Sequence, residues 1–448
     1  EIKLNTFFPV MLLCTLQEFR QCFSKPNYEY FKAYIWAMMI NDSKKRMTNM
    51  AEVCFFKPKS LSSFNRFLSE NKWDISAVKR KMVEIILRQF PQQLLFFGEL
   101  LAIVDTTLVA KASKKMLSVQ KWHPSSGTAE KMNGVFGHHW GLIGLVIKHP
   151  VRYICFPLIA RLIQGKKNRE QWVGLPNGTI RPANFWDAIM ALILELKSYL
   201  PDDINFRLVA DAYFSKVPFI KQLRESGIHL VSRLRRDSVA WDPHSLSPGP
   251  RKRGRPKKRG TKWKLAALLH IFRPTVITTK LYGKSCQIEF VCRDVYLRSL
   301  NDLTRVVIVR SAGSSNVPTI LMSTDCSLTA LQIIQIYSTR FSLEISIRDL
   351  KQHCGFGDYQ CYTTLAFFRF VALSCISFCL WMIALVKNYS FLLHVPHHSF
   401  KNTSPLSFAR LKNSLKRFVI EKIIFEKFSH HANLPFIQDD LEALFRVA

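Results

Sequence analysis

Two short, mainly apolar runs that each end in an aspartate constrain the fold of this chain more than any other feature. They are Leu100–Asp105 (LLAIVD) and Phe206–Asp211 (FRLVAD). Runs of this kind are typical of strands that are buried on both faces of a sheet. An unpaired carboxylate is costly to bury there unless a cation or a base offsets its charge. The sequence therefore predicts a central sheet with two acids at strand ends, and we expect neighbouring strands at 140–147, 151–157 and 228–234.

Helical patterns surround these strands and indicate an α/β fold. Residues 184–200 form an amphipathic helix, and residues 216–226 form another that Gly227 closes. The first 97 residues also have helical periodicity. Within them, residues 60–69 (SLSSFNRFLS) expose polar side chains, including Arg66, in the way a DNA recognition helix does. An ordinary helical hairpin explains that segment equally well.

The composition changes after residue 235. Residues 242–250 are rich in proline and serine, and residues 251–262 (RKRGRPKKRGTK) contain eight basic residues in twelve. Strand-like runs then follow at 275–282, 285–296, 304–309 and 318–322. We interpret this region as a β-rich insertion, after which residues 324–327 (TDCS) are expected to cap a helix.

That helix carries an unusual stripe of polar residues. Apolar residues run through the whole of segment 333–351, yet five polar residues recur in it at steps of three or four: Tyr337, Arg340, Glu344, Arg348 and Lys351. At 3.6 residues per turn these five lie within an arc of about 80°. A solvated helix face is usually broader and more mixed in sign. A single acid inside a narrow basic stripe therefore points to a site.

The overall charge restricts the partners of the chain. Lys and Arg number 64 and Asp and Glu 32, which gives a net charge of +32. Such an excess attracts polyanions, and nucleic acid or an anionic membrane surface is the expected partner. The hydrophobic content of 48% excludes a wholly disordered basic chain. The 11 cysteines include no Cys-x-x-Cys pair and are interpreted as buried thiols in a reducing compartment rather than zinc ligands or disulfides.

A 17-residue run without charge, Phe370–Val386, has the minimum length for a membrane span. We favour a buried core helix, because only one such run occurs and the basic charge is spread over the whole chain. Segment 7–14 is short and contains Pro9, so it is a poor signal peptide. No targeting signal is recognised in the sequence, which begins at Glu1 without a methionine.

The three acids Asp105, Asp211 and Glu344 suggest one kind of chemistry. Oxygen ligands of this type suit Mg²⁺ or Mn²⁺, and two such ions can activate a nucleophile and stabilise the leaving oxygen in phosphodiester cleavage. The basic residues of the stripe would then hold phosphates that flank the cleaved one. A salt-bridge role explains Glu344 alone but not the two aspartates.

The spacing Tyr337-x2-Arg340-x3-Glu344-x6-Lys351 resembles the Tyr-Arg-Glu-Lys signature of insertion-sequence DDE transposases, the superfamily typed on insertion sequence four. Segments around Asp105, residues 137–140, residues 209–214 and residues 323–325 are also similar to that family. The resemblance implies a ribonuclease-H-like core with a mixed sheet flanked by helices and interrupted by a β-rich insertion. It also implies that Asp105, Asp211 and Glu344 are the catalytic, metal-binding triad, with two Mg²⁺ ions that Mn²⁺ can replace.

The resemblance covers roughly residues 95–390; together with the periodicity and composition outside it, the resemblance divides the chain, and it names the partners. The expected regions are a helical DNA-binding domain (1–97), the two parts of the core (98–234 and 324–395), the insertion with its basic loop (235–323) and a basic helical tail (396–448). Expected partners are double-stranded element ends and target DNA, bound by a homodimer in the cytoplasm, in association with the bacterial nucleoid. Many relatives have Arg and Gly-Phe after the second aspartate, whereas Ala212, Tyr213 and Phe214 follow it here. This difference puts a local phosphate contact in doubt but not the ligand.

Two further sets of candidates lie in the insertion. Arg253-Gly-Arg255-Pro resembles the core of an AT-hook, which lies in narrow A·T minor grooves, and Lys257 and Lys258 extend its charge. A solvated basic loop is the alternative. Relatives use a tryptophan of this insertion to stack a flipped base, for which Trp241 and Trp263 are the candidates. His138 and His139 are interpreted as structural residues rather than ligands.

These observations predict a DNA transposase that cuts the ends of its element and joins the 3′ ends to target DNA. A catalytically inactive DNA-binding protein derived from such an enzyme is the alternative, and a membrane protein built around residues 370–386 is a second one. Retention of all three acids weighs against the first alternative.

Overall fold

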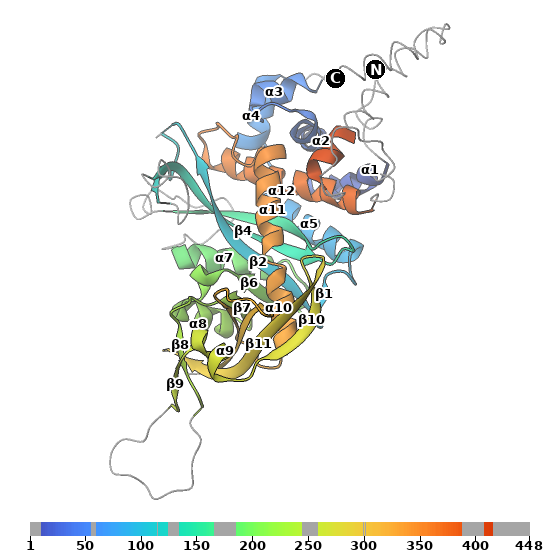
Figure 1. Ribbon diagram of the computed structural model, residues 1–448. Helices are drawn as coiled ribbons and strands as arrows, with labels where there is room; N and C mark the ends of the chain where they lie inside the picture. Colours follow the sequence, from blue (N-terminus) through green and yellow to red (C-terminus); the bar gives the residue numbers. More distant parts are fainter. Residues whose placement is uncertain are drawn as a thin grey trace, which may run out of the picture.

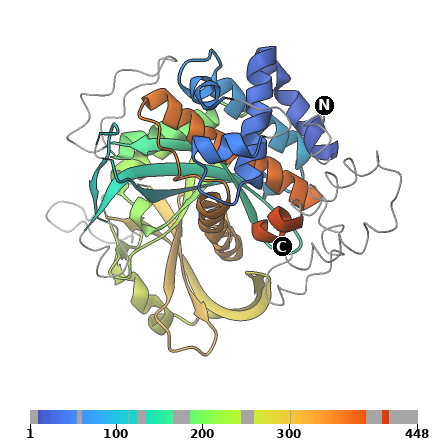
Figure 2. The ribbon, with the colours of Figure 1, turned by 90° about the horizontal axis from the view of Figure 1, so that it is seen from above.

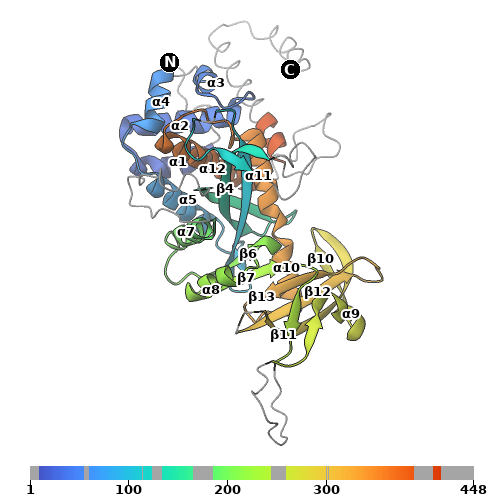
Figure 3. The ribbon, with the colours of Figure 1, turned by 90° about the vertical axis from the view of Figure 1, so that its left-hand side faces the viewer.

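The computed structural model describes residues 10–54, 60–113, 115–123, 134–164, 185–243, 259–298, 300, 302–387 and 407–414. Figure 1 shows three regions stacked along one direction: N-terminal helices in blue, a central sheet with its helices, and a β-rich segment in yellow. The same arrangement is visible from the side in Figure 3, where the β-rich segment extends away from the helices.

The core sheet has the strand order β5–β4–β2–β6–β7. Its strands are β2 (Glu99–Ala110), β4 (Val135–Ile147), β5 (Ile154–Ile163), β6 (Phe206–Ala210) and β7 (His229–Arg233). β4 pairs antiparallel with β2 and β5, whereas β2, β6 and β7 run parallel. Two short strands, β1 (Leu95–Phe96) and β3 (Gln120–Trp122), pair with β2 and β4. This mixed order is that of a ribonuclease-H-like fold and confirms the predicted fold class.

Helices cover both faces of this sheet, which explains why its strands are apolar runs. Trp140 of β4 packs against Phe356 and Phe368, at a ring-centroid distance of 5.6 Å from the latter. Its neighbour Gly141 faces the other way, where a Cβ would lie 3.0 Å from Ile189. Since successive side chains of a strand point to opposite faces, one face packs on α11 (Phe341–His353) and α12 (Thr364–Lys387), and the other on α7 (Phe185–Lys197). Helix α8 (Val217–Glu225) packs on β7.

The N-terminal helices assemble around α12. They are α1 (Val10–Gln17), η2 (Glu18–Cys22), α2 (Lys25–Ile40), α3 (Met47–Glu52), α4 (Leu61–Ser69) and α5 (Ile75–Gln89). Helices α2, α4 and α5 contact α12, which lies between them and the sheet in Figure 2. The buried Arg369 of α12 donates to the backbone oxygens of Leu68 (3.0 Å) and Trp73 (2.6 Å). These bonds attach the chain between α4 and α5 to the core.

Helix α12 is long and apolar enough to cross a membrane, and it is the one such helix in the described residues. Within its most apolar window of 18 residues, however, 89% of the residues are buried inside the protein. The predicted role of Phe370–Val386 as a core helix is therefore confirmed for this fold.

The β-rich segment extends the core sheet instead of forming a separate one. Its elements are β8 (Val239–Trp241), β9 (Lys262–Lys264), η5 (Leu265–Ala267), α9 (Leu268–Ile271), β10 (Thr275–Leu281), β11 (Lys284–Leu297), β12 (Leu303–Ser311) and β13 (Thr319–Ser323). β13 pairs antiparallel with β7, so the 13 strands of the described residues belong to one sheet.

Two sequence expectations about element ends are wrong. β2 does not stop at Asp105, because the β-branched and apolar residues 106–109 continue to pair with β4 as far as Ala110. Residues 324–327 do not cap the helix that follows. Asp325 accepts from Ser327 and pairs with Arg207, so it stabilises a turn, and Thr329 forms the N-cap of α10 (Ala330–Ser338).

The striped helix is also divided into two, α10 and α11. At the junction the backbone N–H groups of Thr339, Arg340 and Ser342 donate to oxygens three residues back instead of four. The hydroxyls of Ser338, Thr339 and Ser342 donate to oxygens three residues back as well, each at 2.7 Å. Hydroxyl groups that bond to the preceding turn compete with the α-helical pattern and tighten it locally. The stripe therefore crosses a tighter turn at Arg340.

Candidate active site

Asp105 and Asp211 lie side by side because their strands are parallel and in register. Ile103 of β2 pairs with Val209 of β6, and each aspartate lies two residues beyond its member of this pair. A strand repeats its side-chain direction every two residues, so each aspartate continues the row that its pair begins. The pairing between the two strands ends here, since β6 stops at Ala210.

The backbone around Asp211 fixes the direction of its carboxylate. The residue is the N-cap of the 3-10 helix η4 (Ala212–Phe214), and its Oδ1 accepts from the N–H of Tyr213 at 2.9 Å. Its own carbonyl oxygen accepts from the hydroxyl of Ser232 on β7 at 2.8 Å. Asp211 is thus held from both sides at the carboxyl end of its strand.

Glu344 reaches the same place from the first turn of α11. Arg340 links it to β2, because the guanidinium Nη1 lies 2.6 Å from Glu344 Oε1 and 3.9 Å from Asp105 Oδ2. The other oxygen of Asp105 accepts from the N–H of Thr106 at 2.7 Å. One nitrogen atom therefore lies between two of the three acids that the sequence singled out.

The electrostatics show that the three acids influence one another. The pKa of Asp105 is raised to about 6, first by burial and also by the nearby charges of Asp211 and Glu344. The Thr106 N–H and the Arg340 guanidinium act in the opposite direction. A buried acid beside two further acids is an arrangement that binding of a cation would stabilise.

The donor set fits a hard divalent cation, although the side chains do not yet surround one position. Among the residues that the structure describes, no three His, Cys, Asp or Glu side chains gather closely enough to hold a metal ion as they stand. Carboxylate oxygens are nevertheless the ligands that Mg²⁺ and Mn²⁺ prefer. Two of the three acids instead share the cationic group of Arg340.

The remaining residues of the stripe lie at different distances from the acids. Tyr337, whose pKa burial raises, is within electrostatic range of Arg340, Arg233 and Asp211. Lys351 Nζ donates to the backbone oxygen of Leu108 on β2 at 2.9 Å. Arg348 donates instead to Asp349 at 2.9 Å. The structure thus brings Tyr337, Arg340 and Glu344 together near the aspartates, places Lys351 further along β2, and pairs Arg348 with its neighbour.

The tip of the β10–β11 hairpin lies beside this site. Tyr282 (φ 51°) and Gly283 (φ 79°) form the two-residue turn between Leu281 and Lys284. A Cβ on Gly283 would lie 3.6 Å from the backbone oxygen of Val151, so the tip contacts the loop before β5. Burial raises the pKa of Tyr282, and Arg340, the second cause, lowers it. The hairpin therefore brings an aromatic side chain of the insertion within electrostatic range of Arg340.

A pocket of about 450 Å³ opens between this hairpin tip, the loop before β5 and the α10–α11 junction. Basic and aromatic side chains contribute to its lining: His149, Arg152, Tyr153, Lys280, Tyr282 and Phe341. Tyr282 is 67% exposed and Phe341 is 51% exposed. Sequence reasoning missed both aromatic residues. The pair Tyr282-Gly283 between two strand-like runs was a turn signal, but nothing local indicates where the turn lies.

The two tryptophan candidates of the insertion are not near the acids. Trp263 donates from Nε1 to Asp242 Oδ2 at 2.6 Å, and Arg259 lies over the Trp241 ring at 5.0 Å. Both residues belong to the β8–β9 pair, which Figure 1 shows at the end of the insertion away from the β10–β11 turn. The pairing of β8 with β9 holds both tryptophans at that end of the insertion.

The other DNA-binding candidates are only partly described. Arg66 is exposed on α4, as the sequence predicted, and the N-cap of this helix, Ser60, accepts from the N–H of Ser63 at 3.2 Å. Arg253, Arg255, Lys257 and Lys258 lie outside the described residues. The strands that flank their segment are β8 and β9.

The two histidines of β4 have structural surroundings. His138 Nδ1 lies 2.6 Å from the Tyr359 hydroxyl and its Nε2 lies 2.7 Å from the Leu117 oxygen, while Trp140 donates to the same hydroxyl at 3.0 Å. Burial lowers the pKa of His138 and that of His139 to about 4. His139 packs against Trp122 with ring centroids 4.8 Å apart. Both rings are thus neutral packing groups.

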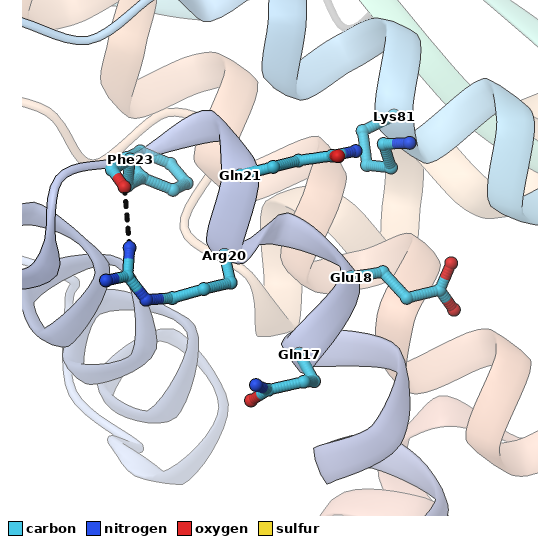
Figure 4. A pocket seen from close by; sticks show the side chains of 6 residues that line it. All are labelled: Gln17, Glu18, Arg20, Gln21, Phe23 and Lys81. Carbon is cyan, nitrogen blue, oxygen red and sulfur yellow. Dashed lines mark hydrogen bonds between the residues drawn. The ribbon is translucent and has the colours of Figure 1, made fainter.

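A second pocket, of about 590 Å³, lies among the N-terminal helices, distant from the acids along the chain and in space. It is lined by Gln17, Glu18, Arg20, Gln21, Phe23 and Lys81 (Figure 4). Arg20 donates across it to the Phe23 oxygen at 2.8 Å. Its lining contains a single acid and no buried basic side chain, so it does not have the features of the candidate active site. The pocket is a surface hollow between η2 and α5.

Two family models match the chain over the residues that form this site. The model described as DDE superfamily endonuclease matches residues 18–273, and the model described as transposase DDE domain matches residues 188–380. Together the two matches include Asp105, Asp211 and Glu344. No curated protein matches the chain. Because the first match extends over more than half of the sequence, the chain belongs to the DDE superfamily of endonucleases, with a transposase DDE domain.

Proposed function

We propose that the protein is a DNA transposase that binds the ends of its element, cleaves them by metal-dependent phosphodiester hydrolysis and joins the 3′ ends to target DNA. One observation carries the proposal. Asp105 and Asp211 are in register on parallel strands, and Glu344 approaches them from α11, linked to Asp105 through Arg340. A structural role does not account for two aspartates placed together beside a third acid.

Asp105, Asp211 and Glu344 are the proposed catalytic residues and metal ligands. When bound, two Mg²⁺ ions, or Mn²⁺ in their place, activate the attacking oxygen and stabilise the leaving one. The carboxylate of Asp211 is oriented for this task by the Tyr213 N–H, and that of Asp105 by the Thr106 N–H. The chain thus supplies oriented oxygen donors, and its basic residues supply the contacts to DNA.

The DNA contacts near the acids come from the stripe. We assign Arg340, Lys351 and the hydroxyl of Tyr337 to phosphates that flank the cleaved one, and Arg348 to a phosphate further along the strand. Further contacts are assigned to Arg66 on α4 and to Arg253, Arg255, Lys257 and Lys258 of the basic segment. The net charge of +32 supports this assignment, since each neutralised phosphate releases counterions.

The pocket at the hairpin tip is suited to an unpaired nucleotide of the DNA end. Tyr282 and Phe341 offer exposed aromatic faces, and Lys280 and Arg152 offer positive charge in the same pocket. Stacking on an aromatic ring is worth ~1–3 kcal/mol per base. We therefore assign base stacking to Tyr282, in preference to Trp241 and Trp263, whose rings take part in the β8–β9 contacts.

The proposal includes a homodimer that acts on paired ends and a location in the cytoplasm, with the nucleoid DNA as substrate. An inactive DNA-binding descendant is the other candidate function. The presence of all three acids and all four residues of the Tyr-Arg-Glu-Lys signature favours the enzyme.

The test is incubation of the purified full-length chain with the terminal DNA of its element and Mg²⁺, followed by mapping of the cuts on each strand. Cuts at the element ends are expected for the wild-type protein and for Glu99→Gln, which changes an acid on the same strand as Asp105 that pairs with Arg207. Glu344→Gln is expected to bind DNA and leave it intact. DNA binding without any cleavage by the wild-type protein would favour the inactive descendant.

A further inference from the structure

Arg340 is positioned as a counter-ion of the acids and not only as a DNA contact. Its Nη1 atom lies 2.6 Å from Glu344 Oε1 and 3.9 Å from Asp105 Oδ2. The two carboxylate oxygens are therefore no further apart than the sum of these distances. Only about a fifth of the Arg340 side chain is exposed, so the contact is largely shielded from solvent.

A divalent cation and this guanidinium compete for the same oxygens. A Mg²⁺ ion sits about 2.0–2.1 Å from its oxygen ligands. An ion shared by Asp105 and Glu344 would thus lie within a few ångströms of Nη1, where two positive charges repel each other strongly in a poorly solvated site. Either the guanidinium or the ion can neutralise this pair of acids, and the arrival of one disfavours the other.

The surroundings of Arg340 allow it to exchange partners. It lies at the tight turn between α10 and α11, and its backbone contacts are bonds to residues three positions away rather than a regular helical ladder. Its side chain begins beside the pocket at the hairpin tip, whose lining includes Thr339 and Phe341 on either side of it. A DNA phosphate in that pocket would offer the guanidinium a second anionic partner with good geometry.

We propose that Arg340 couples metal binding to DNA binding, and we call this coupling an interlock. Without DNA, Arg340 pairs with Asp105 and Glu344. When a DNA phosphate binds Arg340 instead, the two acids become available to the divalent cation. The inference rests on the proposed function, in which these acids are the metal ligands. By thermodynamic linkage the coupling is mutual, so that DNA tightens metal binding as much as the metal tightens DNA binding. The interlock limits metal loading in the absence of DNA.

The test measures Mn²⁺ binding to the full-length protein, by the loss of the free Mn²⁺ signal in electron paramagnetic resonance. Arg340→Gln removes the charge and keeps the approximate size of the side chain. Without DNA, it is expected to bind Mn²⁺ about tenfold more tightly than the wild-type protein. Arg88→Gln removes the arginine of α5 that pairs with Glu18 of η2, outside the site, and is expected to leave Mn²⁺ affinity unchanged.

The second part adds a duplex that ends at the cleaved terminus of the element, with the Mn²⁺ bound by the duplex alone subtracted. The gain in Mn²⁺ affinity on adding DNA is expected to be several-fold larger for the wild-type protein than for Arg340→Gln. Arg340→Lys, which keeps a charge, is expected to restore part of that gain. Thermal unfolding of each variant verifies that the fold is retained.

The outcomes separate this inference from the proposed function. Equal or weaker Mn²⁺ binding by a folded Arg340→Gln, together with loss of binding in Glu344→Gln, would overturn the interlock and leave the metal-binding acids in place. Mn²⁺ binding that Glu344→Gln does not change would overturn the proposed function, and the interlock with it. If Arg340→Gln failed to fold, a wild-type Mn²⁺ affinity that DNA does not change would overturn the interlock by itself.

Discussion

Among the individual residues, Asp105 has the most unusual surroundings. It is the only one of the three acids that lies within a strand, where β4 pairs with it through Leu142. Burial raises its pKa to about 6, so near neutral pH it is close to the point at which it gains a proton. Binding of a cation to such a buried carboxylate stabilises the protein, since the cation offsets the free-energy cost of the buried negative charge.

Our first prediction concerns the three acids. Asp105→Asn, Asp211→Asn and Glu344→Gln are each expected to abolish strand cleavage and to keep the fold. DNA binding is expected to persist or to become tighter, because negative charge near the phosphates falls. Cleavage by the wild-type protein is expected with Mg²⁺ or Mn²⁺ and not with Ca²⁺, which holds a looser geometry. Gel assays of end cleavage check this, and a Glu344→Gln protein that cuts at the wild-type rate would contradict the triad.

The second prediction concerns Lys351 of α11, which contacts the strand of Asp105 by donating to the Leu108 oxygen. Lys351→Gln is expected to lower the rate of end cleavage by about a hundredfold, the size of effect seen when one charge-stabilising donor is removed. DNA affinity is expected to change by less than about threefold, because many other cations contribute to it.

The matched control is Lys221→Gln on α8, an exposed lysine that lies away from the acids, which is expected to change neither quantity. An equal loss of cleavage and affinity in Lys351→Gln would show that Lys351 is a general anchor for DNA and not a group that positions the cleaved phosphate.

At this scale the sequence predicted the acids and the stripe but not their neighbours. Asp105, Asp211 and Glu344 were visible because apolar runs ended in acids and because the stripe had a fixed spacing. Tyr282 was not visible, since its position depends on how a hairpin formed more than 50 residues before Tyr337 folds back over the core. Local sequence carries no information about such a contact.

Among the elements, the junction of α10 and α11 has sequence signals of its own. Ser338, Thr339 and Ser342 place three hydroxyls close together in the chain, where they bond to backbone oxygens and favour tighter winding. The N-cap of α10 also has a local signal, which our expectation of a cap at residues 324–327 overlooked. Thr329-x-x-Gln332 is a capping-box sequence, and the structure forms both of its bonds.

The third prediction concerns the basic segment between β8 and β9. It contains eight basic residues between Arg251 and Lys262. Arg253→Ala combined with Arg255→Ala is expected to weaken DNA binding and to flatten its dependence on salt, by about one unit of slope for each phosphate that the variant no longer binds. Fluorescence anisotropy at several salt concentrations measures both.

A suitable control replaces two exposed lysines outside that segment and outside residues 1–97, for instance Lys197→Ala on α7 with Lys221→Ala on α8. If the Arg253/Arg255 double variant kept both the affinity and the slope of the wild-type protein, the segment would take no part in binding.

Across the whole molecule, one buried ionic cluster joins the N-terminal helices to the core. Glu195 of α7 accepts from Lys79 of α5 at 2.9 Å and from Arg161 of β5 at 2.7 Å. Tyr199 also donates to it at 3.0 Å. Burial alone would raise the pKa of Glu195, but Lys79 and Arg161 outweigh burial and lower the pKa to about 2.

The fourth prediction follows from that pKa. A folded-state pKa below the unfolded value means that the unfolded chain binds more protons, so the contribution of Glu195 to stability is complete above pH ~4.5 and is lost as the pH falls towards 2. The loss is on the order of 3 kcal/mol. Glu195→Gln is expected to be less stable at pH 7 and to depend less on pH between 5 and 3. Urea unfolding at each pH measures this.

The control is Glu84→Gln, which removes an exposed acid that pairs with Lys81 on the same helix α5. It is expected to follow the wild-type curve. A Glu195→Gln protein with an undiminished loss of stability between pH 5 and 3 would show that the cluster does not titrate as a unit.

The position of α12 has a consequence for the order in which the protein can fold during synthesis. Helices α2, α4 and α5 leave the ribosome long before residues 364–387, yet they bury their apolar faces against those residues. For most of translation, the apolar faces of these helices therefore remain exposed because α12 has not yet been made. Exposed apolar surface of this kind promotes aggregation. Once made, α12 is apolar enough to insert into a membrane, and packing against the N-terminal helices is the alternative that buries it in the protein. A fragment that ends near residue 97 lacks α12, so the apolar faces of α2, α4 and α5 that pack on it would stay exposed. The N-terminal region thus depends on the last third of the chain for its own core.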